Sequence, residues 1–489
     1  MVRTLWLIVL VACGADGAGK DTSASGTETT PTGGATGSTT TGGTPAGTTP
    51  AGTTPTGTTP SGTGTTEPVF TARCDRSGLH PLVATCAVQL DPAGPVTATL
   101  EADGVATRVV SAVIDGDGAI VVPYLHADRS YSWRVEADGS PPALGELSTG
   151  SLPMRLEADL AIEGAPTMPR VLTTVPCDGV EAGPSYVVVV DTEPLGVTWF
   201  AELDGDDPMQ ARRTFDGTLA MVSFGSRVME WSPDGAVLTD FVSPDPFLHH
   251  DLDIRDGRVA ALWKETGLGP DGTRIDEGFA VFDRDGVVLG RFAMTDLIPP
   301  PEGAQDWLHS NGIEWLADGD VIVSLRHQSA VLRVAADPDS PDFGAVRWWL
   351  TGEPDQDLPS DFVVLGIDGG PDDFRMQHDA HLLADGSLLM FDNRGRTDRT
   401  PVSEPSRAVR LVLDPVAGEA RVVESWPLER HCPFSGTARL ADDGTLLVVC
   451  APYWDVSAFA EGDVAPGWSM TVACGSGYTS GWTRRVMAP

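Results

Sequence analysis

Histidine and arginine side chains recur in the second half of this sequence at a spacing that suggests a shared site. Three histidines each precede an Asp-Gly dipeptide by six to nine residues. If a repeating fold brought them together, their imidazoles and a nearby guanidinium would suit a small oxyanion such as sulfate. The three are His250, His309 and His378, which precede Asp256-Gly257, Asp318-Gly319 and Asp385-Gly386, and the guanidinium is that of Arg326.

Two other interpretations of these histidines are open. They can be structural residues whose hydrogen bonds tie neighbouring repeats together, or three imidazoles can bind zinc. Arg326 argues against the metal, because a guanidinium beside a metal cation is repelled. We therefore predict an anion site without a metal. No cofactor is expected either. Residues 14–20 match the GxxxxGK spacing of a phosphate loop, but Asp21 stands where Ser or Thr should follow and no strand precedes the segment.

The elements that must position these residues are hairpins. From about residue 152 one unit recurs along the sequence, namely an apolar run, an Asp-Gly dipeptide and a second apolar run. Asp-Gly favours a tight hairpin turn in which both central residues have positive φ. Repeated hairpins without helical periodicity predict a β-propeller over 152–489, with six blades fitting the length best. Equivalent positions of successive blades meet at the central axis, which would bring the histidines together. A large sandwich or β-helix is the alternative. The dipeptides begin at Asp216, Asp256, Asp285, Asp318, Asp385 and Asp443.

Short alternating strands precede the repeats, in residues 68–151. The segment Tyr131-Ser132-Trp133-Arg134-Val135 alternates apolar and polar side chains, as a half-buried strand does. About eighty residues of such strands suit a small immunoglobulin- or fibronectin-like β-sandwich. The fold class predicted for the whole chain is therefore all-β. Strands are expected at 84–89, 96–101, 119–123 and 131–136.

The N-terminus has the features of an export signal. Arg3 is followed by an apolar run, Leu5 to Val11, that ends at Ala12-Cys13 and is too short to span a bilayer. This pattern is similar to a bacterial lipoprotein signal, so residues 1–13 are expected to direct lipidation of Cys13 and anchoring of the exported protein in a membrane. A simple secretion signal is the alternative. Residues 14–67, rich in Thr, Gly and Pro, are predicted to form a disordered linker.

The cysteine content indicates disulfide bonds, and the net charge limits the classes of binding partner. An even number of cysteines besides Cys13 favours disulfides in an exported protein, with Cys74 and Cys86 as the expected local pair. The pairing of Cys177, Cys432, Cys450 and Cys474 is left open. A net charge of −37 disfavours nucleic-acid binding. The oligomeric state is not defined by the sequence.

Three segments of the sequence resemble signature segments of the bacterial arylsulfate sulfotransferases. The segment 391–393, Phe-Asp-Asn, also resembles that family, and Leu248-His249-His250-Asp251 does so less distinctively. The three segments are Asp306-Trp307-Leu308-His309-Ser310-Asn311, Ser324-Leu325-Arg326-His327-Gln328-Ser329-Ala330 and Gln377-His378-Asp379-Ala380-His381-Leu382.

The resemblance implies a role for each matching residue. His378 would be the nucleophile that carries the sulfo group as a sulfohistidine, while His250, His309 and Arg326 would hold the sulfate. Either His250 or His309 would protonate the departing phenolate. Asn311 and Thr437 would contact the substrate, although the match around Thr437 is loose.

The expected function is transfer of a sulfo group from a phenolic sulfate ester to an acceptor phenol, in two half-reactions and without a nucleotide sulfate donor. The identity of donor and acceptor is open. Two alternatives are a non-catalytic surface propeller that binds a ligand or another cell, and a metal-dependent hydrolase on the same fold.

Overall fold

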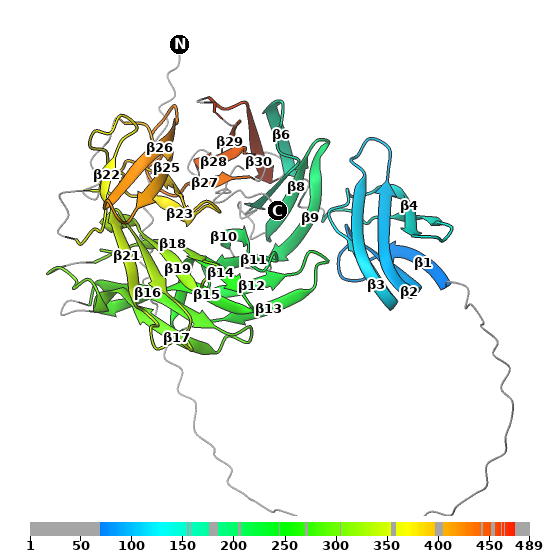
Figure 1. Cartoon of the computed structure of the whole chain (residues 1–489), viewed down its shortest axis with the longest axis horizontal. Helices are drawn as coiled ribbons and strands as arrows, with labels where there is room; N and C mark the ends of the chain where they lie inside the picture. The colour runs from blue at the N-terminus through cyan, green and yellow to red at the C-terminus, as the bar shows by residue number, and fades with distance from the viewer. Residues whose placement is uncertain are drawn as a thin grey trace, which may run out of the picture. The chain divides into compact units, whose positions relative to one another are not determined.

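β-Strands make up the regular structure of this protein. The computed structural model describes residues 69–474, except 154–155, 157, 176–183, 204–205, 207, 244, 269–271, 304, 354–357, 397–403, 442–443, 451–454, 461 and 464 (Figure 1). Apart from two 3-10 turns, η1 (Met294–Asp296) and η2 (Arg326–Gln328), every element there is a strand. No helix in these ranges has the length and hydropathy to cross a membrane. The all-β prediction is confirmed, whereas the predicted signal, Cys13 and the linker at 14–67 lie outside the described residues.

Five strands at the start of the described chain belong to one sheet. The predicted strands 84–89 and 96–101 are parts of a single long strand, whose pairing with its neighbour shifts register between Leu90 and Gly94. Cys74 faces Cys86 across a strand pair and forms a disulfide with it, as predicted. The strands are β1 (Val69–Arg76), β2 (Ala84–Glu101), β3 (Arg108–Val122), β4 (Ser130–Ala137) and β5 (Ala143–Ser148).

Six further sheets follow in the described residues, and the first five are each built from strands that are close in sequence, whereas the sixth also includes β6 from the start of this region. The first contains β7 (Arg170–Val175), β8 (Ser185–Thr192) and β9 (Leu195–Leu203). The second contains β10 (Pro208–Arg213), β11 (Leu219–Ser223), β12 (Arg227–Trp231) and β13 (Val237–Val242). The third contains β14 (Phe247–Arg255), β15 (Arg258–Leu268), β16 (Arg274–Phe282) and β17 (Val288–Ala293).

The remaining three sheets continue this order along the chain. The fourth contains β18 (Ser310–Trp315), β19 (Asp320–Leu325), β20 (Ala330–Ala335) and β21 (Val346–Thr351). The fifth contains β22 (Val363–Leu365), β23 (His378–Leu382), β24 (Leu388–Asp392), β25 (Arg407–Asp414) and β26 (Glu419–Pro427). The sixth contains β27 (Thr437–Leu440), β28 (Leu446–Cys450), β29 (Asp455–Phe459), β30 (Trp468–Cys474) and β6 (Ala158–Gly164).

One edge strand of each of the six sheets, called its first strand below, lies beside the corresponding strand of the next sheet. β7 contacts β10, β10 contacts β14, and the series continues through β18 and β23 to β27. The last sheet returns to the beginning, because β6 pairs along its length with β30 and β30 also contacts β7 (Figure 1). The six sheets therefore meet one another in chain order, and strands from the two ends of this region complete the series.

Each described glycine of the Asp-Gly dipeptides lies in a turn between two paired strands, but the predicted turn type is right at only one of them. Asp256 and Gly257 both have positive φ, at 50° and 71°, in a two-residue connection. At Gly217 only the glycine has positive φ, and its N–H donates to the carbonyl of Thr214 in a three-residue loop. Three-residue loops tolerate an ordinary first residue, so the requirement for two positive φ values was wrong there. Gly286, Gly319 and Gly386 follow the Gly217 pattern, and the N–H of Gly444 likewise donates to the carbonyl three residues earlier, that of Ala441.

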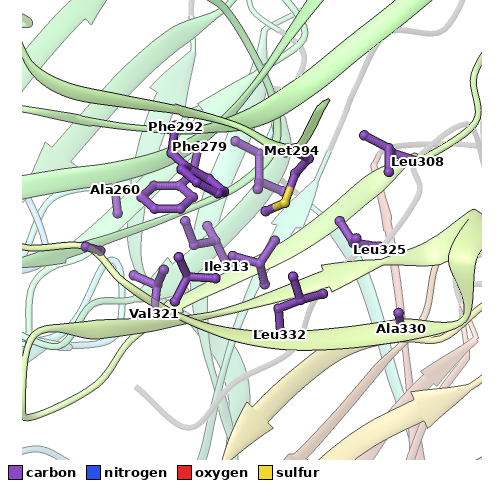
Figure 2. Close-up of a cluster of buried hydrophobic side chains, with 14 of the residues drawn as sticks. Ala260, Phe279, Phe292, Met294, Leu308, Ile313, Val321, Leu325, Ala330 and Leu332 are labelled. Atoms are coloured by element: carbon purple, nitrogen blue, oxygen red, sulfur yellow. The ribbon is translucent and has the colours of Figure 1, made fainter. Parts of the chain in front are cut away.

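An apolar cluster between the third and fourth sheets supports the segments that carry candidate site residues. The rings of Phe279 and Phe292 lie with centroids 5.3 Å apart in this cluster (Figure 2). Leu308 and Leu325 belong to it as well and are almost fully buried. Because these two leucines directly precede His309 and Arg326, their burial fixes the positions from which both polar side chains project.

Candidate active site

Irregularities in the first strands of the sheets set the direction of the candidate histidines. Strand register shifts between Leu248 and Leu252 in β14, between Ser310 and Gly312 in β18, and between His378 and His381 in β23. Such bulges bend a strand and re-aim its side chains. Non-glycine residues with positive φ lie at or beside each shift: His250, His309, Met376 and Asp379. Positive φ is costly for such residues and is concentrated at functional sites.

The structure brings the predicted histidines together. The ring centroids of His250 and His309 are 4.9 Å apart, and that of His327 lies 4.6 Å from His309. Burial lowers the pKa of His250 well below its usual range, and the charges of His249, His309 and His378 lower it further. His250 is therefore a neutral imidazole at neutral pH.

His309 has a carboxylate partner. Its Nδ1 atom lies 2.6 Å from Oδ2 of Asp306, three residues earlier in the chain. Burial would raise the pKa of Asp306, but the hydrogen bond and charge of His309, with the charges of His327 and Arg326, outweigh burial and hold that pKa well below its usual range. Asp306 is therefore ionised and stabilises a proton on Nδ1 of His309.

Arg326 lies in the same cluster, as predicted. Its backbone N–H donates to the carbonyl of His309, and its Nη2 donates to the carbonyl of Pro433 at 3.2 Å. Its Nη1 lies 2.6 Å from Nε2 of His327. Burial, followed by the charges of His309 and Arg326, lowers the pKa of His327 to about 4, so this imidazole accepts the guanidinium N–H in its neutral form.

Asp306, His309 and His327 resemble a metal-binding group, because one ligand atom from each lies within 4.8 Å of the others. The hydrogen bonds of His327 do not fit that role. Its Nδ1 donates to the backbone carbonyl of Asp306 at 2.6 Å, and its Nε2 accepts from Arg326. Both ring nitrogens are thus engaged, and a cation at this point would face the guanidinium.

His378 is almost fully buried and has a defined partner at each ring nitrogen. Nδ1 lies 2.6 Å from Oδ1 of Asn393, and the backbone N–H of Ser435 donates to Nε2 at 3.1 Å. Burial lowers the pKa of His378 well below its usual range, and the charge of Arg326 adds to this effect, while hydrogen bonds to Asn393 and the Met376 backbone oppose it. Arg326 and His378 both bond to the segment 433–435, through the Pro433 carbonyl and the Ser435 N–H, which brings His378 to the same cluster.

The two predicted substrate contacts lie beside the cluster. The side chain of Asn311 donates from Nδ2 to the carbonyl of Gln377, the residue before His378. Thr437 is buried at the start of β27, two residues after Ser435. Both positions adjoin the environment of His378, and their roles toward a substrate stay predictions.

The cluster also contains residues to which the sequence assigned no role, among them Asp306, His327, Asn393 and Ser435. Asp306 and Asn393 lie within the segments that resemble the sulfotransferases, so sequence offered a signal without a function. Ser435 acts through its backbone N–H, a group that nearly every residue type has, so the residue type gave no signal. His249, also unassigned, shares a hydrogen bond of 2.6 Å with His250 through the two Nδ1 atoms.

Buried charges hold the strands that carry the histidines. Arg212 on β10 donates to the carbonyls of Leu252 and Ile313, on β14 and β18. Arg439 on β27 pairs with Asp379 on β23 at 2.5 Å, and its Nη1 lies 3.4 Å from Glu314 on β18. These bonds connect five successive first strands, so the positions of the histidines depend on all of them.

Comparison with known proteins gives one family assignment. The sequence profile of the arylsulfotransferase (ASST) family matches residues 171–455, which is more than half of the chain. The match spans all four of the clustered residues predicted from sequence. No curated protein is significantly similar in sequence.

Several solved structures show a distant likeness to this chain. A protein of unknown function from Bacteroides caccae is 13% identical, with a TM-score of 0.41, over 65% of this chain and 98% of the other. Virginiamycin B lyase from Staphylococcus aureus is 10% identical, with a TM-score of 0.34, over 65% and 88%. A putative 6-phosphogluconolactonase from Bacteroides fragilis is 12% identical, with a TM-score of 0.34, over 78% and 94%. Likeness at this level does not indicate an activity.

Proposed function

Because the chain belongs to the arylsulfotransferase family and is thus an aryl-sulfate sulfotransferase acting on small phenolic substrates, we propose that it transfers the sulfo group through His378 in two half-reactions. The single observation that carries this proposal is the state of His378. It is a buried, neutral imidazole within the electrostatic reach of Arg326 and His309. A neutral imidazole beside a guanidinium is suited to attack an anionic ester whose charge the guanidinium offsets.

In the first half-reaction a lone pair of His378 forms a bond to sulfur while the bond from sulfur to the phenolic oxygen breaks. The electron pair of that bond leaves with the oxygen as phenolate. Arg326 holds sulfonate oxygens, and positioning with charge stabilisation lowers the barrier, as in phosphoryl transfer. The imidazole keeps its own proton, so the sulfohistidine is a cationic ring bearing an anionic sulfonate.

Proton transfer is the task of His309. Its Nδ1 is engaged with Asp306, so its Nε2 is the atom that gives a proton to the departing phenolate. The second half-reaction reverses this path: His309 takes the proton of the acceptor phenol, the phenolic oxygen bonds to sulfur, and the nitrogen–sulfur electron pair returns to His378. The Nδ1 of His250 meets the imidazole of His249 and its ring is neutral, so it serves as a hydrogen-bonding neighbour.

The test is to mix the protein with 4-nitrophenyl sulfate without an acceptor and to measure intact mass. We expect one sulfo group per chain on the wild type, mapped to the peptide that contains His378, and release of that group when a phenol is added. His378→Ala should remain unmodified and inactive. His381→Gln, three residues along the same strand, is the matched control and should form the adduct. A folded His378→Ala protein that transfers sulfate at a near-normal rate would contradict the proposal.

We also propose that the six sheets are the blades of a six-bladed propeller and that β1–β5 form a small immunoglobulin- or fibronectin-like sandwich. The serial contacts of β7, β10, β14, β18, β23 and β27 support the first, since they place one strand of each sheet next to the following sheet. The two halves of β2 support the second, since Ala84–Leu90 pairs with β1 and Val96–Glu101 pairs with β4. A crystal structure would test both, and a seventh blade would refute the first.

For cellular location we propose export and lipid anchoring through Cys13, with residues 1–13 as the signal and 14–67 as a tether to the domains at 68–151 and 152–489. The two disulfides that the described residues form, Cys74–Cys86 and Cys432–Cys450, support an oxidising compartment. Membrane fractionation of wild type and Cys13→Ala tests this proposal. Release of the variant into the soluble fraction is expected, and an unacylated, soluble wild type would refute it.

A further inference from the structure

The amide orientation of Asn393 is fixed by its surroundings. Its Nδ2 donates to two backbone carbonyls, those of Cys432 and Ser435, each at 2.8 Å. Carbonyl oxygens only accept hydrogen bonds, so a rotated amide would set Oδ1 against two acceptors and lose both bonds. Oδ1 must therefore be the atom that faces His378.

This orientation dictates the tautomer of His378. Since Oδ1 of Asn393 can only accept, the Nδ1 atom 2.6 Å away must carry a hydrogen. The opposite ring atom gives independent evidence, because the Ser435 N–H donates to Nε2, which must then present a lone pair. Two neighbours on two sides of the ring thus require the same tautomer.

We propose that Asn393 is a positioning residue that holds His378 as the Nδ1–H tautomer and so makes Nε2 the atom that receives the sulfo group. This inference rests on the proposed function of His378. In water, histidine prefers the other neutral tautomer, with the proton on Nε2, which would block that atom. When Nε2 bonds to sulfur, the ring becomes cationic at Nδ1–H, and the Asn393 oxygen stabilises that charge.

The segment that contains Ser435 lies against the nucleophilic atom. Asn393 holds this segment through Cys432 and Ser435, and Cys432 is linked to Cys450 by a disulfide. The Ser435 N–H bond to Nε2 must be given up when the sulfur approaches. A single bond of 3.1 Å is a modest cost, so the same contact that sets the tautomer does not prevent attack.

The first test measures the tautomer directly in the full-length protein labelled with 15N-histidine. Two-bond 1H–15N correlation spectra distinguish Nδ1–H from Nε2–H, and the His378 signals are those missing from His378→Gln. We expect Nδ1–H in the wild type and a shift toward Nε2–H in Asn393→Ala. Ser406→Ala is the matched control: Ser406 accepts from Cys432 N–H and donates to the Asn393 carbonyl, so its loss disturbs the same segment without touching His378.

The second test is kinetic. We expect Asn393→Ala to lower kcat by roughly 100-fold with little change in KM, because a misplaced proton disables the nucleophile and not binding. Ser406→Ala should stay within about threefold of wild type. Asn393→Asp keeps an acceptor at Nδ1 and should restore activity in part, with its acidic limb moved to higher pH, because a carboxylate favours the protonated ring.

Several outcomes would overturn the inference. These are Nε2–H in the wild type, an Asn393→Ala protein with unchanged kcat, or an inactive Asn393→Ala protein that keeps Nδ1–H. A wild type with Nδ1–H that forms no sulfo adduct would instead refute the proposed function and leave the tautomer assignment standing.

Discussion

Asp306 Oδ2 and His309 Nδ1 lie 2.6 Å apart, and this bond distinguishes His309 from the other histidines of the cluster. His250 meets a second imidazole at its Nδ1, and His378 meets an amide. A carboxylate partner stabilises an imidazolium, so His309 is the histidine whose environment suits acid and base catalysis.

Replacing Asp306 with Asn should therefore affect substrates according to their leaving groups. An unsubstituted phenolate needs protonation as it departs, whereas nitrophenolate does not. We expect kcat/KM of Asp306→Asn to fall roughly 100-fold for phenyl sulfate and less than about tenfold for 4-nitrophenyl sulfate. Steady-state rates with a series of phenyl sulfates measure the difference. Asp339→Asn, at an exposed carboxylate, is the control, and equal losses across the series would remove the assignment of His309 as acid.

Removal of the Arg326 guanidinium should weaken transition-state stabilisation for every sulfate-ester donor. We expect Arg326→Ala to raise the activation free energy by about 2–4 kcal/mol, as for loss of a charge-assisted clamp. The ratio of kcat/KM values for wild type and variant gives this energy. Lys264 is an imperfect control, because its charge influences His249 and Glu277. Arg347→Ala, on the exposed side of β21, should change little, and similar losses from both variants would show that the site is misplaced.

The reaction should tolerate mild acid. Burial and Arg326 lower the pKa of His378 well below 6.5, so its attacking form is populated down to that pH and is lost only below it. With 4-nitrophenyl sulfate, whose leaving group needs no proton, we expect the rate of adduct formation to be constant from about pH 8 to 6.5. Stopped-flow detection of nitrophenol provides the measurement. A decline centred at pH 6.5 would indicate an unperturbed histidine.

A buried carboxylate outside the site should stabilise the fold. Asp191 on β8 pairs with Arg170 at 2.8 Å and with Arg108 of β3. Burial would raise its pKa, but hydrogen bonding to His126 and the charges of Arg170 and Arg108 outweigh burial and lower it. The stabilisation is therefore present above the ordinary pKa of 3.8 and disappears as pH falls through the lower folded value.

We accordingly expect Asp191→Asn to lose about 3–5 kcal/mol of stability at pH 7, seen as a lower Tm. The gap between variant and wild type should narrow below about pH 4. Asp240→Asn, at a more exposed ion pair, should lower Tm by much less. A Tm gap that is the same at pH 3 and pH 7 would contradict the linkage.

The sequence predicted the grouping of His250, His309, His378 and Arg326 because position within a hairpin repeat determines position in space. It predicted the Cys74–Cys86 bond from proximity in the chain. It did not predict which atoms meet, because the contacts of His378 depend on a bulge in β23, on the rotamer of Asn393 and on the backbone of Ser435. Turn type was also missed, since Asp-Gly is compatible with both two-residue and three-residue loops.

The pairing of β6 with β30 has a consequence for how an active molecule is made. The two strands are the first and last of the region that carries the site, so their contact is among the most distant in sequence and its loop-closure entropy is correspondingly large. A nascent chain that lacks β30 can form the first five of the six sheets but leaves β6 without its partner strand. Competence for sulfo transfer should consequently arise only after β30 has been made and has paired with β6, and deletion of β30 should be more harmful than its separation from His378 along the chain suggests.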